Sequence, residues 1–167
     1  MYKNIGIVTG GGDAPGLNAV IRAVVRTAIG EFGLKVYGIE DSFEGLLGDP
    51  QVMKLTTKTV SGILPRGGTI LGTRNRGSFC KFVNGKVVYP EEILSEALEN
   101  LGKLEIEALI VLGGEGTLAI AEQFYKRGFP VIGVPKTIDN DLAATELTFG
   151  FMTAIDIATE ALDRLHT

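Results

Sequence analysis

Short apolar runs alternate along the chain with segments whose apolar residues recur at helical spacing. Four runs are short, mostly β-branched and followed or interrupted by glycine, which is typical of strands: residues 5–9, 35–39, 108–112 and 130–134. Three segments have the helical period: residues 17–29, 118–126 and 152–165. Because the runs are continuous rather than alternating, they favour parallel strands buried on both faces.

The alternation of predicted strands with predicted helices indicates a doubly wound, Rossmann-like α/β fold. Such a fold has a mostly parallel sheet, helices on both faces and ligands at the carboxyl ends of the strands. Between residues 42 and 92 the pattern weakens into glycine-punctuated loops, which we expect over the rim of the sheet. Asn84-Gly85 indicates a hairpin over residues 81–88. With no internal repeat or linker, residues 1–167 are expected to form one unit.

Composition narrows the class of protein. The 167 residues are 45% hydrophobic and 22% charged, which argues against disorder, and the net charge of −4 lacks the basic excess expected of nucleic-acid or membrane-surface binding. A single cysteine, Cys80, and a single histidine, His166, exclude a disulfide framework and a Cys- or His-rich metal site. A reducing cytoplasm fits, and no targeting or membrane-spanning segment is predicted.

The 23 glycines concentrate where strands end. The first cluster, residues 10–16, reads Gly-Gly-Gly-Asp-Ala-Pro-Gly and stands between a strand and a helix. Glycines there let backbone N–H groups approach a phosphate, and the helix N-terminus adds partial positive charge. An anion site is the functional interpretation, and a tight strand-to-helix turn is the alternative.

A second cluster, Gly113-Gly114-Glu115-Gly116-Thr117, follows another predicted strand. Two such strand ends in one parallel sheet can share a crevice, where Glu115 would hold Mg²⁺ beside phosphates. Alternatively, Glu115 only complements the dipole of the helix that follows.

The third motif, residues 135–141, reads Pro-Lys-Thr-Ile-Asp-Asn-Asp. Two carboxylates, an amide, a hydroxyl and an amine within six residues indicate a ligand site. If this segment is extended, Thr137, Asp139 and Asp141 share a face, and Asp139 can accept a proton from a substrate hydroxyl. The alternative is a polar loop in which Asn140 or Asp141 caps a turn.

A fourth segment, residues 66–77, carries three arginines among glycines. A guanidinium can clamp a transferring phosphoryl group. Taken alone, these arginines would be interpreted as solvated loop residues.

Together the four motifs resemble those of the 6-phosphofructokinase family, in order and spacing, over nearly the whole chain. The resemblance implies Mg²⁺-assisted phosphoryl transfer from ATP to the 1-hydroxyl of fructose 6-phosphate, a step of glycolysis, with Asp139 as general base, Glu115 as metal ligand and Asp13 supporting the metal's hydration shell. It assigns these residues to the donor: Gly12, Arg76, Gly77, Gly114, Glu115, Gly116 and Thr117. It assigns these to the sugar: Thr137, Ile138 and Asp139.

Three departures from the family pattern bear on these roles. Glu115 stands where many ATP-using members have aspartate, and either Arg74 or Arg76 could stabilise the phosphoryl group, with Arg76 preferred because it precedes Gly77. Gly116 leaves room for a nucleotide, whereas Lys136 suits pyrophosphate. The favoured donor is ATP, and pyrophosphate is the alternative.

Family chains usually run to about twice this length and form homo-oligomers. We therefore expect residues 1–167 to be the N-terminal, donor-binding region of a two-lobed chain, with exposed apolar surface near the C-terminal helix. A non-catalytic nucleotide-binding half is the competing interpretation. A lipid or NAD kinase relative is disfavoured by residues 137–141.

Overall fold

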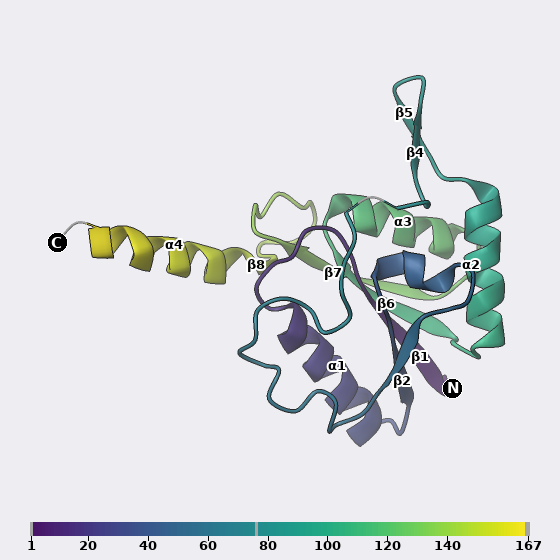
Figure 1. Cartoon of the computed structure of the whole chain (residues 1–167), viewed down its shortest axis with the longest axis horizontal. Helices are drawn as coiled ribbons and strands as arrows, with labels where there is room; N and C mark the ends of the chain where they lie inside the picture. The colour runs from purple at the N-terminus through teal and green to yellow at the C-terminus, as the bar shows by residue number, and fades with distance from the viewer. Residues whose placement is uncertain (1, 76, 166–167) are drawn as a thin grey trace.

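A six-stranded sheet forms the centre of the computed structural model, which describes residues 2–75 and 77–165 (Figure 1). The strand order is β3-β2-β1-β6-β7-β8, and of the described strands in this sheet β3 alone runs antiparallel to its neighbour. The strands are β1 (Asn4–Thr9), β2 (Lys35–Ile39), β3 (Val52–Leu55), β6 (Ala108–Gly113), β7 (Val131–Thr137) and β8 (Phe149–Gly150).

Helices cover both faces of the sheet, as the alternation of strands and helices predicts. Helix α1 (Leu17–Gly30) packs on one face, whereas α2 (Glu91–Lys103) and α3 (Glu115–Lys126) pack on the other. Successive strand side chains point to opposite faces, so Ile7 joins the α1 core and Val8 the α2–α3 core. The doubly wound α/β fold is confirmed.

The chain leaves β1 toward β2 on one side and returns to β6 on the other. In open α/β sheets the crevice at such a change of direction, outside the carboxyl ends of the strands, is where ligands bind. Here it lies between β1 and β6, which pair in parallel from Ile5↔Ala108 to Thr9↔Leu112. The glycine clusters that follow these two strands therefore meet at one place.

Several elements differ from the sequence-based expectations. Helix α3 begins at Glu115, and β7 continues to Thr137, because its Lys136 and Thr137 pair with β8. Helix α2, strand β3 and the short 3-10 helix η1 (Ser42–Leu46) were not predicted. The predicted hairpin is confirmed, because β4 (Lys81–Val83) and β5 (Lys86–Val88) pair on either side of Asn84 and Gly85, whose φ values are 50° and 76°.

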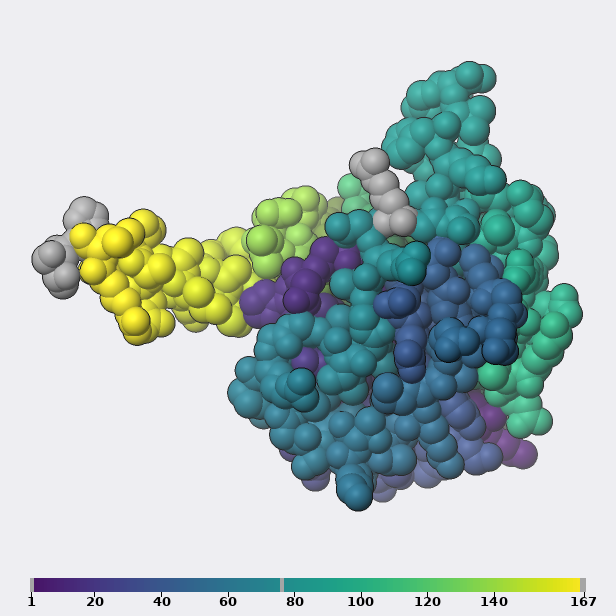
Figure 2. All heavy atoms as spheres, in the orientation of Figure 1, coloured from purple at the N-terminus to yellow at the C-terminus, as the bar shows by residue number. Residues whose placement is uncertain are grey.

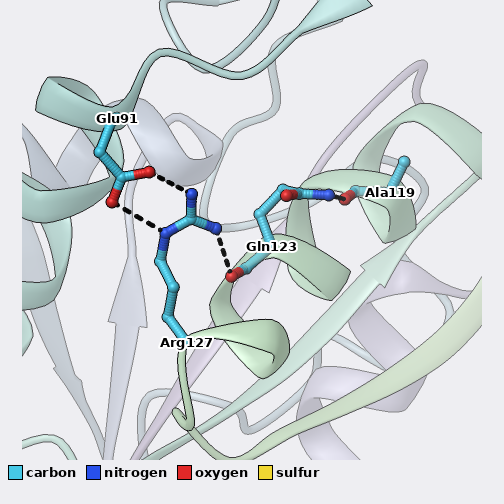
Figure 3. Close-up of polar contacts among 4 residues, drawn as sticks. All are labelled: Glu91, Ala119, Gln123 and Arg127. Atoms are coloured by element: carbon cyan, nitrogen blue, oxygen red, sulfur yellow. Dashed lines mark hydrogen bonds and ion pairs between the residues drawn. The ribbon is translucent and has the colours of Figure 1, made fainter.

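One ion pair joins the two helices on the α2–α3 face (Figure 3). The Arg127 guanidinium donates to both carboxylate oxygens of Glu91, with an Nε···Oε1 distance of 3.2 Å, and to the Gln123 carbonyl oxygen at 2.9 Å. The hydrogen bonds from Arg127 to the Glu91 carboxylate lower the pKa of Glu91. The pair links the start of α2 to the end of α3.

The last helix, α4 (Phe151–Leu165), projects away from the body, as does the β4–β5 hairpin (Figures 1 and 2). No described residue of α4 is buried. Its exposed apolar side chains are Met152, Ile155, Ile157, Leu162 and Leu165. The exposed apolar surface expected near the C-terminal helix is thus observed. Among the described helices, none has both the length and the apolar character to cross a bilayer.

Candidate active site

The glycine loop after β1 is held by backbone hydrogen bonds. Gly10 donates its N–H to the Leu112 carbonyl oxygen at 2.9 Å, and Gly11, with φ 79°, donates to the Arg74 carbonyl oxygen at 3.0 Å. The Thr73 hydroxyl donates to the Gly11 carbonyl oxygen at 2.6 Å. Glycine accommodates the left-handed conformation at residue 11 without strain. The two hydrogen bonds of Gly11 join the glycine loop to the arginine-bearing segment.

Thr117 fills the space between the two glycine clusters. A Cβ at Gly10 would lie 2.6 Å from Thr117 Cγ2, and a Cβ at Gly113 would lie 2.4 Å from Thr117 Cβ. The glycines at these two strand ends are therefore needed for close approach. The buried Thr117 side chain has a packing role, which the donor-contact interpretation of the sequence did not include.

Lys136, at the end of β7, is buried to 3% exposure, and its ammonium donates to the Gly12 carbonyl oxygen. Burial lowers its pKa, and the nearby Asp13 carboxylate opposes that shift in part. A buried charge is costly unless it is paired or hydrogen-bonded, so an anion bound beside this ammonium would be stabilised. The lysine predicted as a donor-specificity residue thus contacts the glycine loop that follows β1.

The Thr137–Asp139 segment turns rather than running straight. The Asp139 N–H donates to Thr137 Oγ1 at 3.1 Å, and Asn140 has φ 51°, in the left-handed region. The expectation that Thr137, Asp139 and Asp141 share one face of an extended segment is therefore wrong. Of the two carboxylates, Asp139 lines a cleft at the carboxyl ends of the strands, whereas Asp141 is not among the residues that line it.

These segments enclose one cleft of about 360 Å³ at the carboxyl ends of β1, β6 and β7. Most of the predicted site residues line it: Gly12, Gly114, Glu115, Gly116, Thr117, Lys136, Thr137, Ile138 and Asp139. Gly11, Asp13, Ala14 and Asn75 complete the lining. Three strand ends far apart in sequence thus meet in one cleft.

A second, narrower hollow of about 50 Å³ adjoins the cleft and shares Asn75, Gly116 and Thr117 with it. Gly77 and Arg74 line this hollow, not the main cleft, and Arg74 Nη2 lies 4.0 Å from Asp41 Oδ2. Arg76, the preferred phosphate-stabilising arginine, lies outside the described residues.

Asn75 and Glu44 also line these cavities, and sequence reasoning missed both. Glu44 accepts hydrogen bonds from the Ser78 N–H and hydroxyl, the second at 3.1 Å. Its carboxylate occupies the space that a Cβ at Gly77 would need. The only sequence signal for Asn75 is its place between Arg74 and Arg76, and Glu44 belongs to a segment without a recognisable pattern.

The residues present fit a phosphate-bound Mg²⁺ ion. No group of three or more potential metal ligands forms among the described residues. Mg²⁺ beside phosphates needs only one or two carboxylates, because phosphate oxygens and waters complete its shell. Glu115 and Asp13, both exposed in the cleft, meet that requirement.

A family model described as Phosphofructokinase matches residues 4–167. The chain belongs to the phosphofructokinase family. Among curated phosphofructokinases, an ATP-dependent 6-phosphofructokinase of Chloroflexus aurantiacus is 54% identical over 99% of this chain, and a pyrophosphate–fructose 6-phosphate 1-phosphotransferase of Streptomyces coelicolor is 50% identical over 98%. The chain covers 46% and 45% of these two relatives, less than half of each.

Solved phosphofructokinase structures share the fold. The Pichia pastoris enzyme in the T-state matches with a TM-score of 0.85 and 32% identity, over 100% of this chain and 20% of that one. The Saccharomyces cerevisiae enzyme matches with a TM-score of 0.81 and 32% identity, over 99% of this chain and 24% of that one. The family resemblance inferred from the four motifs is confirmed.

Proposed function

We propose that this chain supplies the donor site and the catalytic base for phosphoryl transfer to the 1-hydroxyl of fructose 6-phosphate, giving fructose 1,6-bisphosphate. The observation that carries the proposal is the cleft itself, which is lined both by the glycine loops after β1 and β6 and by Asp139. Holding donor and acceptor together is the main contribution an enzyme makes to this reaction.

The residues of the cleft divide between donor and acceptor. The β1 and β6 loops, with Gly12 and residues 114–117, would bind the donor phosphates through N–H groups and the α3 N-terminus. Glu115, supported by Asp13, would hold Mg²⁺, which when bound neutralises phosphate charge. Thr137 and Ile138 would face the sugar, and Asp139 would accept the proton from its hydroxyl.

ATP is the donor we favour. A Cβ at Gly116 would meet no atom within 4 Å, so the space beside Gly116, which lines the cleft, is open to a donor larger than pyrophosphate. Lys136 supports pyrophosphate as the alternative donor, because its buried ammonium is a point charge beside the phosphate loop. Both kinds of donor are named among relatives of comparable identity.

Three further features belong to the same proposal: residues 1–167 as the N-terminal region of a longer two-lobed chain, a homo-oligomer, and a cytoplasmic location in glycolysis. The exposed α4 supports the first two. A competing role, which the sequence leaves open, is a nucleotide-binding half without acceptor chemistry.

The test is aldolase-coupled turnover of fructose 6-phosphate with Mg-ATP and, separately, with Mg-pyrophosphate. We expect turnover with ATP. Turnover with pyrophosphate alone would overturn the donor assignment but not the site. Binding of donor without turnover would support the nucleotide-binding half, and failure to bind either donor would overturn the proposed function.

A further inference from the structure

A hydrogen-bonded clasp closes the loop that follows Asp139. Asn140 Oδ1 accepts from the Thr148 N–H at 3.0 Å and from the Thr148 hydroxyl at 3.3 Å, and Asn140 Nδ2 donates to the Glu146 carbonyl oxygen at 3.1 Å. Residues 140 and 148 are thereby joined across the seven residues between them. Such side-chain contacts to backbone are how Asn fixes a local turn.

The clasp also reaches back to the strand that carries the motif. The Thr148 hydroxyl lies 2.9 Å from the Thr137 carbonyl oxygen and 3.3 Å from Asn140 Oδ1, and Thr148 is 5% exposed. Thr137 in turn accepts the Asp139 N–H through its own hydroxyl. Thr148 therefore lies against both ends of the turn that holds Asp139, at Thr137 and at Asn140.

Beyond Thr148 the chain contacts the phosphate loop. Gly150 pairs with Thr137, and at φ 108° a Cβ on it would lie 3.1 Å from Ala14 Cβ and 3.2 Å from the Pro15 carbonyl oxygen. The clasp is therefore continuous with the first glycine loop through β8. Asp139 on one side and the donor cradle on the other are fixed to the same short strand.

We infer that Asn140 and Thr148 are positioning residues, which hold the Asp139 carboxylate at a set distance from the donor cradle without touching either substrate. The inference deepens the proposed function and rests on it for the role of Asp139. Its structural content, that the clasp orders residues 138–147, stands on the hydrogen bonds alone. Because a displacement of about 1 Å can cost on the order of 10²-fold in rate, such a clasp bears directly on turnover.

The first test needs no turnover. Thr148→Val removes the hydroxyl at nearly constant volume, whereas Thr148→Ser keeps it. Thr145→Val is the matched control, because the Thr145 hydroxyl donates to the Leu147 carbonyl oxygen within the same loop and does not reach the motif. We expect amide hydrogen exchange of residues 138–147 to rise at least about fivefold in Thr148→Val alone. Equal exchange in the three variants would overturn the clasp.

The second test measures steady-state kinetics with the donor that supports turnover. Thr148→Val and Asn140→Gly, which tolerates the positive φ but lacks the amide, should lower kcat about 10- to 100-fold and leave the donor KM within about twofold, with Thr148→Ser near wild type. A changed donor KM with unchanged kcat would overturn the positioning role. Asp139→Asn in parallel separates the two claims: full activity in that variant refutes the base, whereas the exchange result still decides the clasp.

Discussion

At the scale of single residues, the proposed donor site holds two residues that would favour different donors, Gly116 for ATP and Lys136 for pyrophosphate. Gly116 lines the second hollow with open space around the position of an added Cβ, and the Lys136 ammonium donates to the Gly12 carbonyl oxygen in the glycine loop after β1. On the proposed function, donor choice would depend on which effect is larger, the open space at Gly116 or the attraction of the Lys136 ammonium for phosphate charge.

Gly116→Asp should lower kcat/KM for ATP about 10- to 100-fold, since a carboxylate a few ångströms from a phosphate is repelled by ~1–4 kcal/mol. Gly116→Ala adds no charge and should stay within about threefold of wild type. The measurement is initial rate against ATP concentration. Equal loss in both variants would show that bulk, not charge, matters at this position.

The buried ammonium of Lys136 predicts a pH-dependent stability. Burial lowers its pKa below the ordinary 10.5, so the unfolded chain binds more protons between the two values and the free energy of unfolding rises with pH there. Below the folded-state pKa both states carry the proton and the slope vanishes. The rise amounts to about 1.4 kcal/mol for each unit of pKa difference.

Urea unfolding of Lys136→Gln and wild type at several pH values up to about 10 checks this sign. The rise with pH should be smaller in Lys136→Gln than in wild type or in Lys58→Gln, in which the replaced lysine is exposed. Parallel curves for all three proteins would contradict the buried-ammonium account.

At the scale of elements, the strand ends depend on glycine for packing. Gly113→Ala places a methyl group 2.4 Å from Thr117 Cβ and should lower the free energy of unfolding by about 1–3 kcal/mol. Gly102→Ala, inside α2 with nothing within 4 Å of the added Cβ, should raise it by about 0.5–1 kcal/mol. Urea unfolding measures both, and a neutral Gly113→Ala would refute the close approach.

Much of this architecture is predictable from the sequence, because continuous apolar runs and glycine-rich strand ends carry strong local signals. The second strand matches its predicted bounds, Lys35–Ile39, and the hairpin follows from Asn84-Gly85. Helix α2 was missed although Glu91 and Glu92 stand in its first turn.

The rest of the site depends on contacts distant in sequence, which no local pattern encodes. Thr117 meets glycines from two strands, Glu44 holds Gly77 and Ser78, and Lys136 reaches Gly12. The bend after Thr137 was also missed, because the left-handed Asn140 is stabilised by Thr148, eight residues further on.

At the scale of the whole molecule, the amphipathic helix α4 projects from the body, and none of its described residues is buried (Figure 2). Exposed apolar patches of this kind bind apolar dyes and mark contact surfaces. Leu162→Lys should reduce ANS fluorescence by about half, whereas Thr159→Lys, which adds the same charge without removing an apolar side chain, should leave it near wild type. Unchanged fluorescence in Leu162→Lys would place the dye site elsewhere.

The central claim is that one cleft brings a phosphoryl donor to Asp139, and it is tested most directly by Asp139→Asn, with kcat and donor Kd measured on the same preparation. The amide keeps the shape of the side chain but cannot accept the proton. We predict a loss of about 10²–10⁴-fold in kcat with donor Kd within about twofold of wild type. Undiminished kcat in Asp139→Asn would contradict the account.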